Sequence, residues 1–187
     1  MASVLLPLAD GFEEIEAVSL IDIMRRGGIE VRVAYLDGEF DTNLVTGANG
    51  ITVQADTLIK NVIAEDFDMI VLPGGWGGTN HLAENKKVQT LLKEFEDQGK
   101  YIGAMCAAPY ALHVAGVLSP RYTCYPSVEE KIRKEGYTDQ EKVVLDGKVM
   151  TSRGPGTAIC FALEIVRLLV GEESYEAVKI GTLSEFC

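Results

Sequence analysis

The chain has 187 residues, of which 47% are hydrophobic, and it carries a formal net charge of −11. That length and hydrophobic content predict one domain, residues 1–187, with a sizeable core. The acidic balance argues against nucleic acid and anionic membranes as partners, since both attract basic surfaces.

The first half of the chain alternates between short apolar runs and helical patterns. We predict strands over residues 3–8, 30–35, 68–72 and 101–105, and helices over 13–26 and 88–98. In the first helix the apolar residues recur at the i, i+3, i+4, i+7 spacing of one helix face. Between the second and third strands, Asp37-Gly38 and Asn49-Gly50 predict hairpins beside short strands.

The second half continues this alternation. A helix is expected after Cys106, and further elements are expected at 122–125 (extended), 143–145 and 148–152 (paired strands), 157–170 and 172–183 (helices). The capping-box spacing of Ser127 and Glu130 indicates a short helix that begins at Ser127. Buried strands that alternate with helices predict an open, largely parallel α/β sheet covered on both faces.

Sites in such sheets lie at the carboxyl ends of strands, and segments 9–16 and 73–78 and Cys106 meet that condition. Cys106 stands at a strand-to-helix junction, where free N–H groups and the helix dipole favour a thiolate. An ordinary thiol, with a pKa of about 8.5, is only roughly 3% ionised at pH 7. An inert buried cysteine is the alternative, but the position makes Cys106 the first candidate nucleophile.

Three carboxylates follow the first strand: Glu13, Glu14 and Glu16. One of them could lie beside Cys106 and, when protonated, donate a hydrogen bond to a thiolate or move a proton. They could equally be solvated charges that favour a helix N-terminus. Sequence spacing does not choose among the three.

Two further loops could offer backbone groups or charge to a substrate. In segment 74–78, Gly74 and Gly75 can bring N–H groups close to an oxyanion, although a flexible turn fits the same residues. The segment lacks the Lys-Ser/Thr pair of a phosphate-binding P-loop. In the later loop, Arg153 could bind an anion or a neighbouring subunit, and Thr157 is expected near a helix N-cap.

The chain has two histidines, His81 and His113. His113 follows Cys106 by seven residues, about 10 Å along a helix, which is too far for a direct hydrogen bond. No histidine follows position 113, so a local Cys-His dyad is not expected and His81 is left as a weak candidate base. With so few histidines and no clustered cysteines, neither a metal site nor a cofactor is expected.

The four cysteines, at positions 106, 124, 160 and 187, are widely spaced and form no CxxC pair. In a domain with a full core we expect all four to be free thiols in a reducing compartment. The N-terminus lacks the basic region of a signal peptide, and no apolar run approaches the roughly 18 residues of a membrane span. A cytoplasmic protein is therefore expected.

Five segments spread over nearly the whole chain resemble the DJ-1/ThiJ/PfpI superfamily, specifically its DJ-1-like branch. They are Gly11-Phe-Glu-Glu-Ile-Glu16-Ala, Asp22-Ile-Met-Arg-Arg26-Gly, Val71-Leu-Pro-Gly-Gly75, Ile102-Gly-Ala-Met-Cys106-Ala-Ala-Pro109 and Thr151-Ser-Arg-Gly-Pro-Gly-Thr157. The resemblance implies a flavodoxin-like, doubly wound α/β fold with a nucleophile-elbow cysteine. It also implies a homodimer.

The resemblance assigns roles that spacing alone leaves open. It selects Glu16 as the protonated acid that hydrogen-bonds the elbow cysteine, Cys106. The backbone N–H groups of Gly75 and Ala107 match positions that form an oxyanion pocket, and Gly74 is expected to line the same pocket.

The residues implied for the pocket margin or the dimer contact are Arg26, Arg153 and Pro155. Two positions depart from the family pattern: Tyr125 stands where DJ-1 members carry a histidine, and Asn49 where an arginine is often found. Tyr125 is kept as a residue of the pocket. A histidine-assisted mechanism gains no support, and an alanine directly after the cysteine breaks the pattern of the PfpI-type proteases.

The resemblance implies an oxidative or carbonyl stress protein. As an enzyme, it would use Cys106 on methylglyoxal-like aldehydes or glycated groups, as a glyoxalase or deglycase. As a sensor, it would oxidise Cys106 to a sulfinate held by Glu16 and helix N–H groups. A redox-dependent chaperone without catalysis is the alternative, and a cysteine hydrolase or peptidase is a weaker one.

Overall fold

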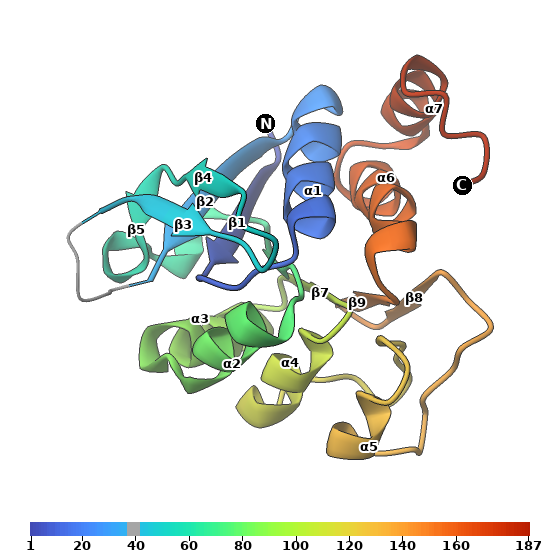
Figure 1. The fold of residues 1–187 in the computed structure, drawn as a ribbon. Helices are drawn as coiled ribbons and strands as arrows, with labels where there is room; N and C mark the ends of the chain where they lie inside the picture. The colour runs from blue at the N-terminus through green and yellow to red at the C-terminus, as the bar shows by residue number, and fades with distance from the viewer. Residues whose placement is uncertain (37–41) are drawn as a thin grey trace.

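The computed structural model describes residues 1–36 and 42–187, and in this part of the chain one large sheet forms the centre of the molecule (Figure 1). Its strand order is β5-β2-β1-β6-β7-β9-β8. These strands are β1 (Ser3–Leu8), β2 (Glu30–Tyr35), β5 (Thr57–Leu58), β6 (Met69–Leu72), β7 (Tyr101–Met105), β8 (Val143–Asp146) and β9 (Val149–Ser152). All neighbouring strands are parallel except β8 and β9, which are antiparallel.

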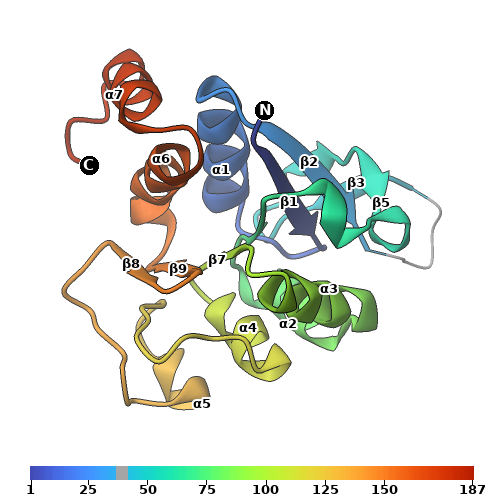
Figure 2. The same cartoon turned by 180° about the vertical axis from the view of Figure 1, so that it is seen from behind.

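Helices cover both faces of the sheet, as the two opposite views show (Figures 1 and 2). One face carries α1 (Glu14–Arg26) and α6 (Ala158–Leu169), with α7 (Glu172–Gly181) packed on α6. The other carries α2 (Trp76–Glu84), α3 (Lys86–Asp97) and α4 (Pro109–Ala115), and the short α5 (Glu129–Ile132) contacts α4. This arrangement confirms the predicted doubly wound α/β fold.

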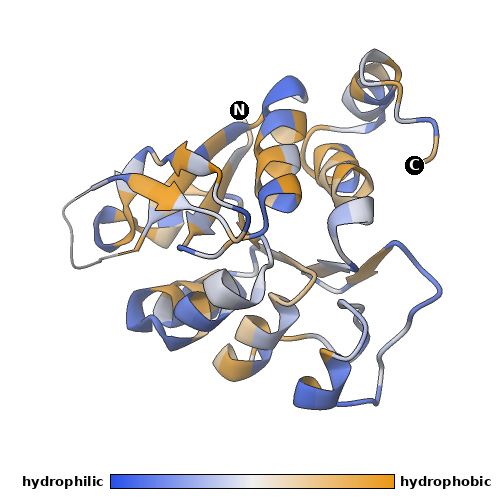
Figure 3. Cartoon of the chain, viewed as in Figure 1, coloured by the Kyte–Doolittle hydropathy of each residue, from blue (hydrophilic) through white to orange (hydrophobic). Residues whose placement is uncertain are grey.

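Each face of the sheet has its own hydrophobic core because successive strand side chains point to opposite sides. In β1, Val4, Leu6 and Leu8 join the core beneath α1 and α6, whereas Leu5 joins the core beneath α3 and α4. Hydrophobic residues dominate these strands and α6, while segment 133–142 is hydrophilic (Figure 3). Across residues 1–36 and 42–187, no helix has both the length and the apolar character to cross a membrane.

The predicted hairpin at Asn49-Gly50 is present. It joins β3 (Leu44–Thr46) to β4 (Thr52–Gln54) as an antiparallel pair outside the main sheet. The other hairpin signal, Asp37-Gly38, lies outside the described residues.

Two local predictions were wrong. The glycine-rich segment after β6 is not a loop throughout, because α2 begins at Trp76. Ser127 does not cap a helix: its φ of 77° is left-handed rather than extended, and α5 begins only after Val128, which makes no side-chain capping bond.

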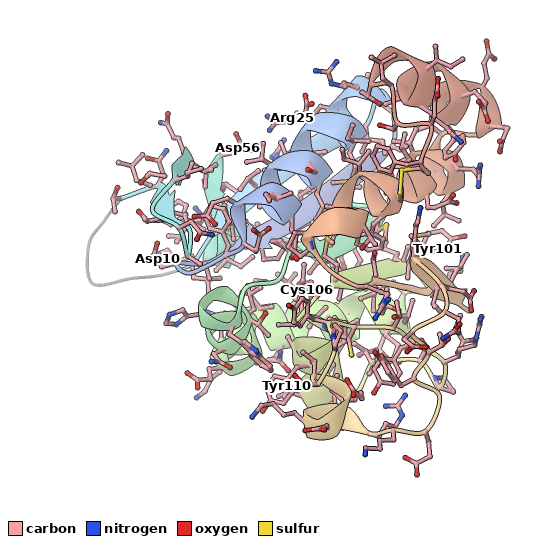
Figure 4. All side chains as sticks on the ribbon, turned by 45° about the vertical axis from the view of Figure 1, so that its right-hand side comes forward. Asp10, Arg25, Asp56, Tyr101, Cys106 and Tyr110 are labelled. Atoms are coloured by element: carbon pink, nitrogen blue, oxygen red, sulfur yellow. A yellow bond between two sulfur atoms is a disulfide. The ribbon has the colours of Figure 1, made fainter. Side chains whose placement is uncertain are left out.

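The prediction of four free cysteines was wrong for two of them. Cys160 and Cys187 form a disulfide, the yellow bond in Figure 4, whereas Cys106 and Cys124 are free and buried. The two bonded residues are 27 positions apart in sequence. They meet because the chain turns back after α7 and brings its C-terminus to α6, a path that no spacing rule reveals.

Candidate active site

Cys106 occupies a strained elbow directly after β7. Its φ of 59° is in the left-handed region, which costs a non-glycine residue roughly 1–2 kcal/mol. Two backbone hydrogen bonds hold it there: its N–H donates to the Ser152 carbonyl at 3.0 Å, and its carbonyl accepts the Tyr125 N–H at 2.9 Å. The residue is 9% exposed, so it is buried but not fully enclosed.

The Gly74-Gly75 turn after β6 presses against this elbow. A Cβ on Gly74 would lie 2.6 Å from the Cβ of Cys106 and 2.8 Å from Oε2 of Glu16. On Gly75, whose φ is +86°, a Cβ would lie 2.5 Å from the Gly11 carbonyl oxygen. Only glycine fits at either position, and this close approach brings the Gly75 N–H to the Cys106 sulfur together with that of Ala107.

Glu16 lies in the first turn of α1, fully buried, beside the Cys106 thiol. Its Oε2 accepts the Gly74 N–H at 2.7 Å, so the Gly74 N–H donates to the Glu16 carboxyl rather than to the Cys106 sulfur. No N–H or O–H group within the described residues reaches its Oε1. Burial raises the pKa of Glu16 to about 7, while the hydrogen bonds with Cys106 and Gly74 act in the opposite direction.

Burial also raises the pKa of Cys106, to about 12, and the charge of Glu16 raises it further. The N–H groups of Gly75 and Ala107 oppose this rise. Thiol and carboxyl therefore titrate as one coupled pair, which loses its first proton near pH 7. When Glu16 is protonated, its charge no longer opposes ionisation of Cys106; burial still does, and the two N–H donors are the groups that favour a thiolate there.

The neighbouring glutamates have other roles. Glu13 caps α1, with its Oε2 accepting the Glu16 N–H at 2.8 Å. Glu14 is tied to the β3–β4 hairpin, where it accepts the backbone and side-chain N–H groups of Asn49 and, at 3.5 Å, the Ile51 N–H. The structure thus brings only Glu16 of the three to the thiol.

The pocket-margin residues lie at different distances from the elbow. The ring of Tyr125 packs over Gly154, where a Cβ would lie 3.1 Å from the tyrosine Cδ2. Arg153 follows Ser152, but its side chain hydrogen-bonds Tyr137 and lies near Cys124 rather than Cys106. Pro155 begins a short 3-10 helix, Pro155–Thr157, before α6, and Thr157 is the N-cap of α6 as predicted.

Arg26 is not part of this site within the chain. It lies in the last turn of α1, exposed and paired with Asp22 at 2.9 Å. Figure 4 labels its neighbour Arg25, which lies at the far end of α1 from Cys106.

Sequence reasoning missed an aromatic pair next to the elbow. The rings of Trp76 and Tyr110 meet edge to face, 6.0 Å apart, and the Lys131 ammonium lies 5.6 Å from the Trp76 ring. Trp76 directly follows Gly75, and Tyr110 lies on the helix that follows Cys106. The sequence feature that could have indicated this pair is Trp76, a large aromatic residue inside the glycine-rich segment 74–78.

Both histidines are exposed, His81 on α2 and His113 on α4. Across residues 1–36 and 42–187, no three His, Cys, Asp or Glu side chains converge as metal ligands would. The expectation that the protein needs no metal stays a prediction.

A thiol on a strand-to-helix elbow, with a buried carboxylic acid beside it at the carboxyl edge of a flavodoxin-like sheet, defines a class of cysteine-centred α/β proteins. Within that class the chain belongs to the DJ-1/PfpI family, whose model matches residues 2–168. It is 42% identical to the Protein dj-1beta of Drosophila melanogaster over 183 residues, which are 97% of this chain and 96% of that protein.

Two further proteins support the assignment. The chain is 40% identical over 173 residues to a Caenorhabditis elegans protein named glutathione-independent glyoxalase DJR-1.2, covering 92% of this chain and 90% of that one. The structure of oxidized Toxoplasma gondii DJ-1 superposes with a TM-score of 0.91 at 36% identity, covering 98% of both chains.

Proposed function

We propose that the protein is a cofactor-independent glyoxalase that converts methylglyoxal-like 2-oxoaldehydes to 2-hydroxy acids. The observation that carries this proposal is the pairing of Cys106 with the buried acid Glu16, under the N–H groups of Gly75 and Ala107. The pair combines a nucleophile, a proton carrier and two donors for an oxyanion. A relative named as a glutathione-independent glyoxalase supports the same activity.

In this mechanism the Cys106 thiolate adds to the aldehyde carbon and forms a carbon–sulfur bond. The carbonyl oxygen becomes an oxyanion that accepts hydrogen bonds from Gly75 and Ala107, and Glu16 supplies its proton. The Glu16 carboxylate then takes the former aldehyde C–H proton, which leaves an enediolate, and returns that proton to the neighbouring carbon. The hydroxyl proton of the first carbon moves to the oxygen of the second, so the product is the thioester of the hydroxy acid. Water cleaves the thioester, so methylglyoxal and water give lactate and the free thiolate.

The test is lactate formation from methylglyoxal without glutathione. We expect turnover by the wild-type protein and a loss of at least about 1,000-fold in kcat/KM for Cys106→Ala. Cys124→Ala is the matched control, because Cys124 is also a buried free thiol, but burial and Glu129, rather than Glu16, raise its pKa. Turnover that survives Cys106→Ala contradicts the proposal. The same assay with a glycated amine distinguishes the deglycase reaction.

A second candidate function is redox sensing through Cys106, in an oxidative or carbonyl stress response. The Gly75 and Ala107 N–H groups could donate hydrogen bonds to the sulfinate oxygens, and the protonated Glu16 carboxyl could donate a third hydrogen bond to one of them. Mild peroxide should add two oxygens to Cys106 before it modifies Cys124, as read by peptide mass. Oxidation of Cys124 first contradicts the sensor role.

The alternative of a redox-dependent chaperone is separable from both roles. Suppression of protein aggregation that survives Cys106→Ser would favour it. We also propose a cytoplasmic location, supported by the free thiols of Cys106 and Cys124, whereas the Cys160–Cys187 disulfide is of a kind that is rare in a reducing compartment.

We further propose a homodimer. On α1, Ile15 and Val18 are 58% and 47% exposed, and Ile51 beside the β3–β4 hairpin is 56% exposed. Glu14 joins this hairpin to α1, so the three apolar side chains belong to one connected surface. Light scattering should give twice the monomer mass, and Val18→Asp should shift the equilibrium to monomer.

A further inference from the structure

The C-terminal segment 182–187 folds back onto the domain. Leu183 has a φ of 55°, the left-handed conformation that reverses the chain after α7. Ser184 is buried, and its carbonyl accepts the Cys187 N–H at 3.0 Å. The Lys142 ammonium donates to the Phe186 carbonyl, so the segment is held to the start of β8 as well as to α6.

The Cys160–Cys187 disulfide that closes this segment borders a cavity of about 750 Å³. Apolar side chains line much of the cavity, and charged side chains complete its wall. The apolar ones are Val143, Leu145, Met150 and Leu168, and the charged ones are Glu141, Lys142, Glu164 and Arg167. The volume suits a small peptide-sized molecule. The wall carries both signs of charge, with Glu164 paired to Arg167 and Glu141 paired to Arg121, so a zwitterion would bind by joining these ion pairs.

The two sulfurs differ in their surroundings. Cys160 is 4% exposed and lies in the first turn of the 12-residue helix α6, where free N–H groups stabilise a thiolate. Cys187 is half-buried at the end of the chain. An incoming thiolate therefore reaches Cys187 more easily, and attack at Cys187 makes Cys160, at the N-terminal end of α6, the leaving group.

We propose that the Cys160–Cys187 disulfide is a thiol–disulfide exchange site for a small zwitterionic thiol that enters this cavity. The thiolate of the small molecule attacks Sγ of Cys187, a new S–S bond forms, and the Cys160–Cys187 bond breaks. Cys160 leaves as a thiolate and takes a proton from water. A second small thiol then releases Cys187 as a thiol and forms the small-molecule disulfide.

Exchange removes the covalent link between the tail and α6. Hydrogen bonds alone then hold residues 182–187, from Lys142 to the Phe186 carbonyl and from Thr182 and Ser184 to carbonyls of α7, so the segment beside the cavity loosens. This site lies on α6 and β8, and its chemistry is independent of the Cys106 reaction. A protein with no glyoxalase activity would still show it.

The experiment uses the full chain carrying Cys106→Ser, so that the elbow thiol does not react, with reduced glutathione as the probe. Peptide mass spectrometry should find glutathione on Cys187 and a free thiol on Cys160. Hydrogen exchange of residues 182–187 should then accelerate at least about tenfold. Adding Cys187→Ser should give the fast exchange without glutathione, while adding Cys124→Ala should leave the response unchanged.

Three results would overturn the proposal. They are glutathione found on Cys160 instead of Cys187, unchanged exchange of residues 182–187 after reduction, and reduction by a bulky protein dithiol but not by glutathione. The first result would mean that the thiol attacks Cys160 rather than Cys187. The second would mean that the disulfide does not restrain residues 182–187, and the third that the cavity is not the route by which the thiol enters.

Discussion

Glu14 and Glu16 are two residues apart on α1, and both are buried, yet their pKa values shift in opposite directions. Burial opposes ionisation of Glu14, but hydrogen bonds from Asn49, from Ile51 and from its own backbone N–H outweigh it and lower its pKa. Glu16 accepts one N–H group, from Gly74, and faces a thiol, so burial prevails and its pKa rises to about 7.

The difference reflects both depth and hydrogen bonding, because Glu16 lies deeper in the protein than Glu14 and also accepts fewer N–H groups. Glu14 has enough donors to remain an anion and fastens a hairpin. Glu16 lacks them, so it can hold a proton near neutral pH and pass it to Cys106 or to a substrate. Four substitutions sharpen or break this contrast.

The largest effect is expected for Glu16→Gln on turnover. The amide keeps the shape of the side chain but cannot carry a proton, so kcat/KM for methylglyoxal should fall by about 10²- to 10⁴-fold. Glu14→Gln is the matched control and should retain turnover wherever it is folded. Wild-type turnover in Glu16→Gln would leave the acid without a catalytic role.

The next largest effect concerns the pH dependence of stability. Because the folded-state pKa of Glu16 is raised from 4.5 to about 7, its contribution is fully present below pH 4.5 and is lost as pH rises through 7. Between pH 4.5 and 8 the wild type should lose up to about 3 kcal/mol relative to Glu16→Gln. Urea unfolding of both proteins measures this, and a constant difference would contradict the raised pKa.

Glu14→Gln should act with the opposite sign. Loss of the charged acceptor of Asn49 and Ile51 should cost about 1.5–3 kcal/mol at pH 7. The Glu14 pKa is lowered, so its contribution is present above pH 4.5 and is lost as pH falls. The gap between wild type and variant should therefore shrink in acid; a gap that widens there would refute the assignment.

The smallest effect is expected at Glu13, which caps α1 through its side-chain oxygen. Glu13→Ala should destabilise the protein by about 1 kcal/mol in thermal or urea unfolding. Glu13→Gln keeps an oxygen that can accept the Glu16 N–H and should cost less. Equal losses in the two variants would show that the charge, not the cap, matters.

Much of the fold followed from local pattern. The strands at Ser3–Leu8 and Tyr101–Met105 have their predicted bounds because apolar runs between turn signals are local features. The helix from Trp76 was missed because glycine disfavours helices. Here Gly77 and Gly78 are required by packing, since a Cβ on either would meet the backbone of Gly11 or Phe12 at 3.0–3.1 Å.

The candidate site was only partly readable from the sequence. Cys106 was found from its position between a strand and a helix, which is local. The choice of Glu16 depends on the Gly74 N–H, which comes from 58 residues further along the chain. Residue patterns do not encode such contacts, so only the family resemblance distinguished Glu16 from Glu13 and Glu14 beforehand.

The left-handed backbone of Cys106 has an evolutionary consequence. Glycine or asparagine would adopt that conformation at less cost, so a cysteine at position 106 lowers the stability of the fold relative to either residue. A lineage that no longer needed the thiol would gain stability by replacing it. For the backbone alone, cysteine at this elbow is therefore a less stable choice than glycine or asparagine.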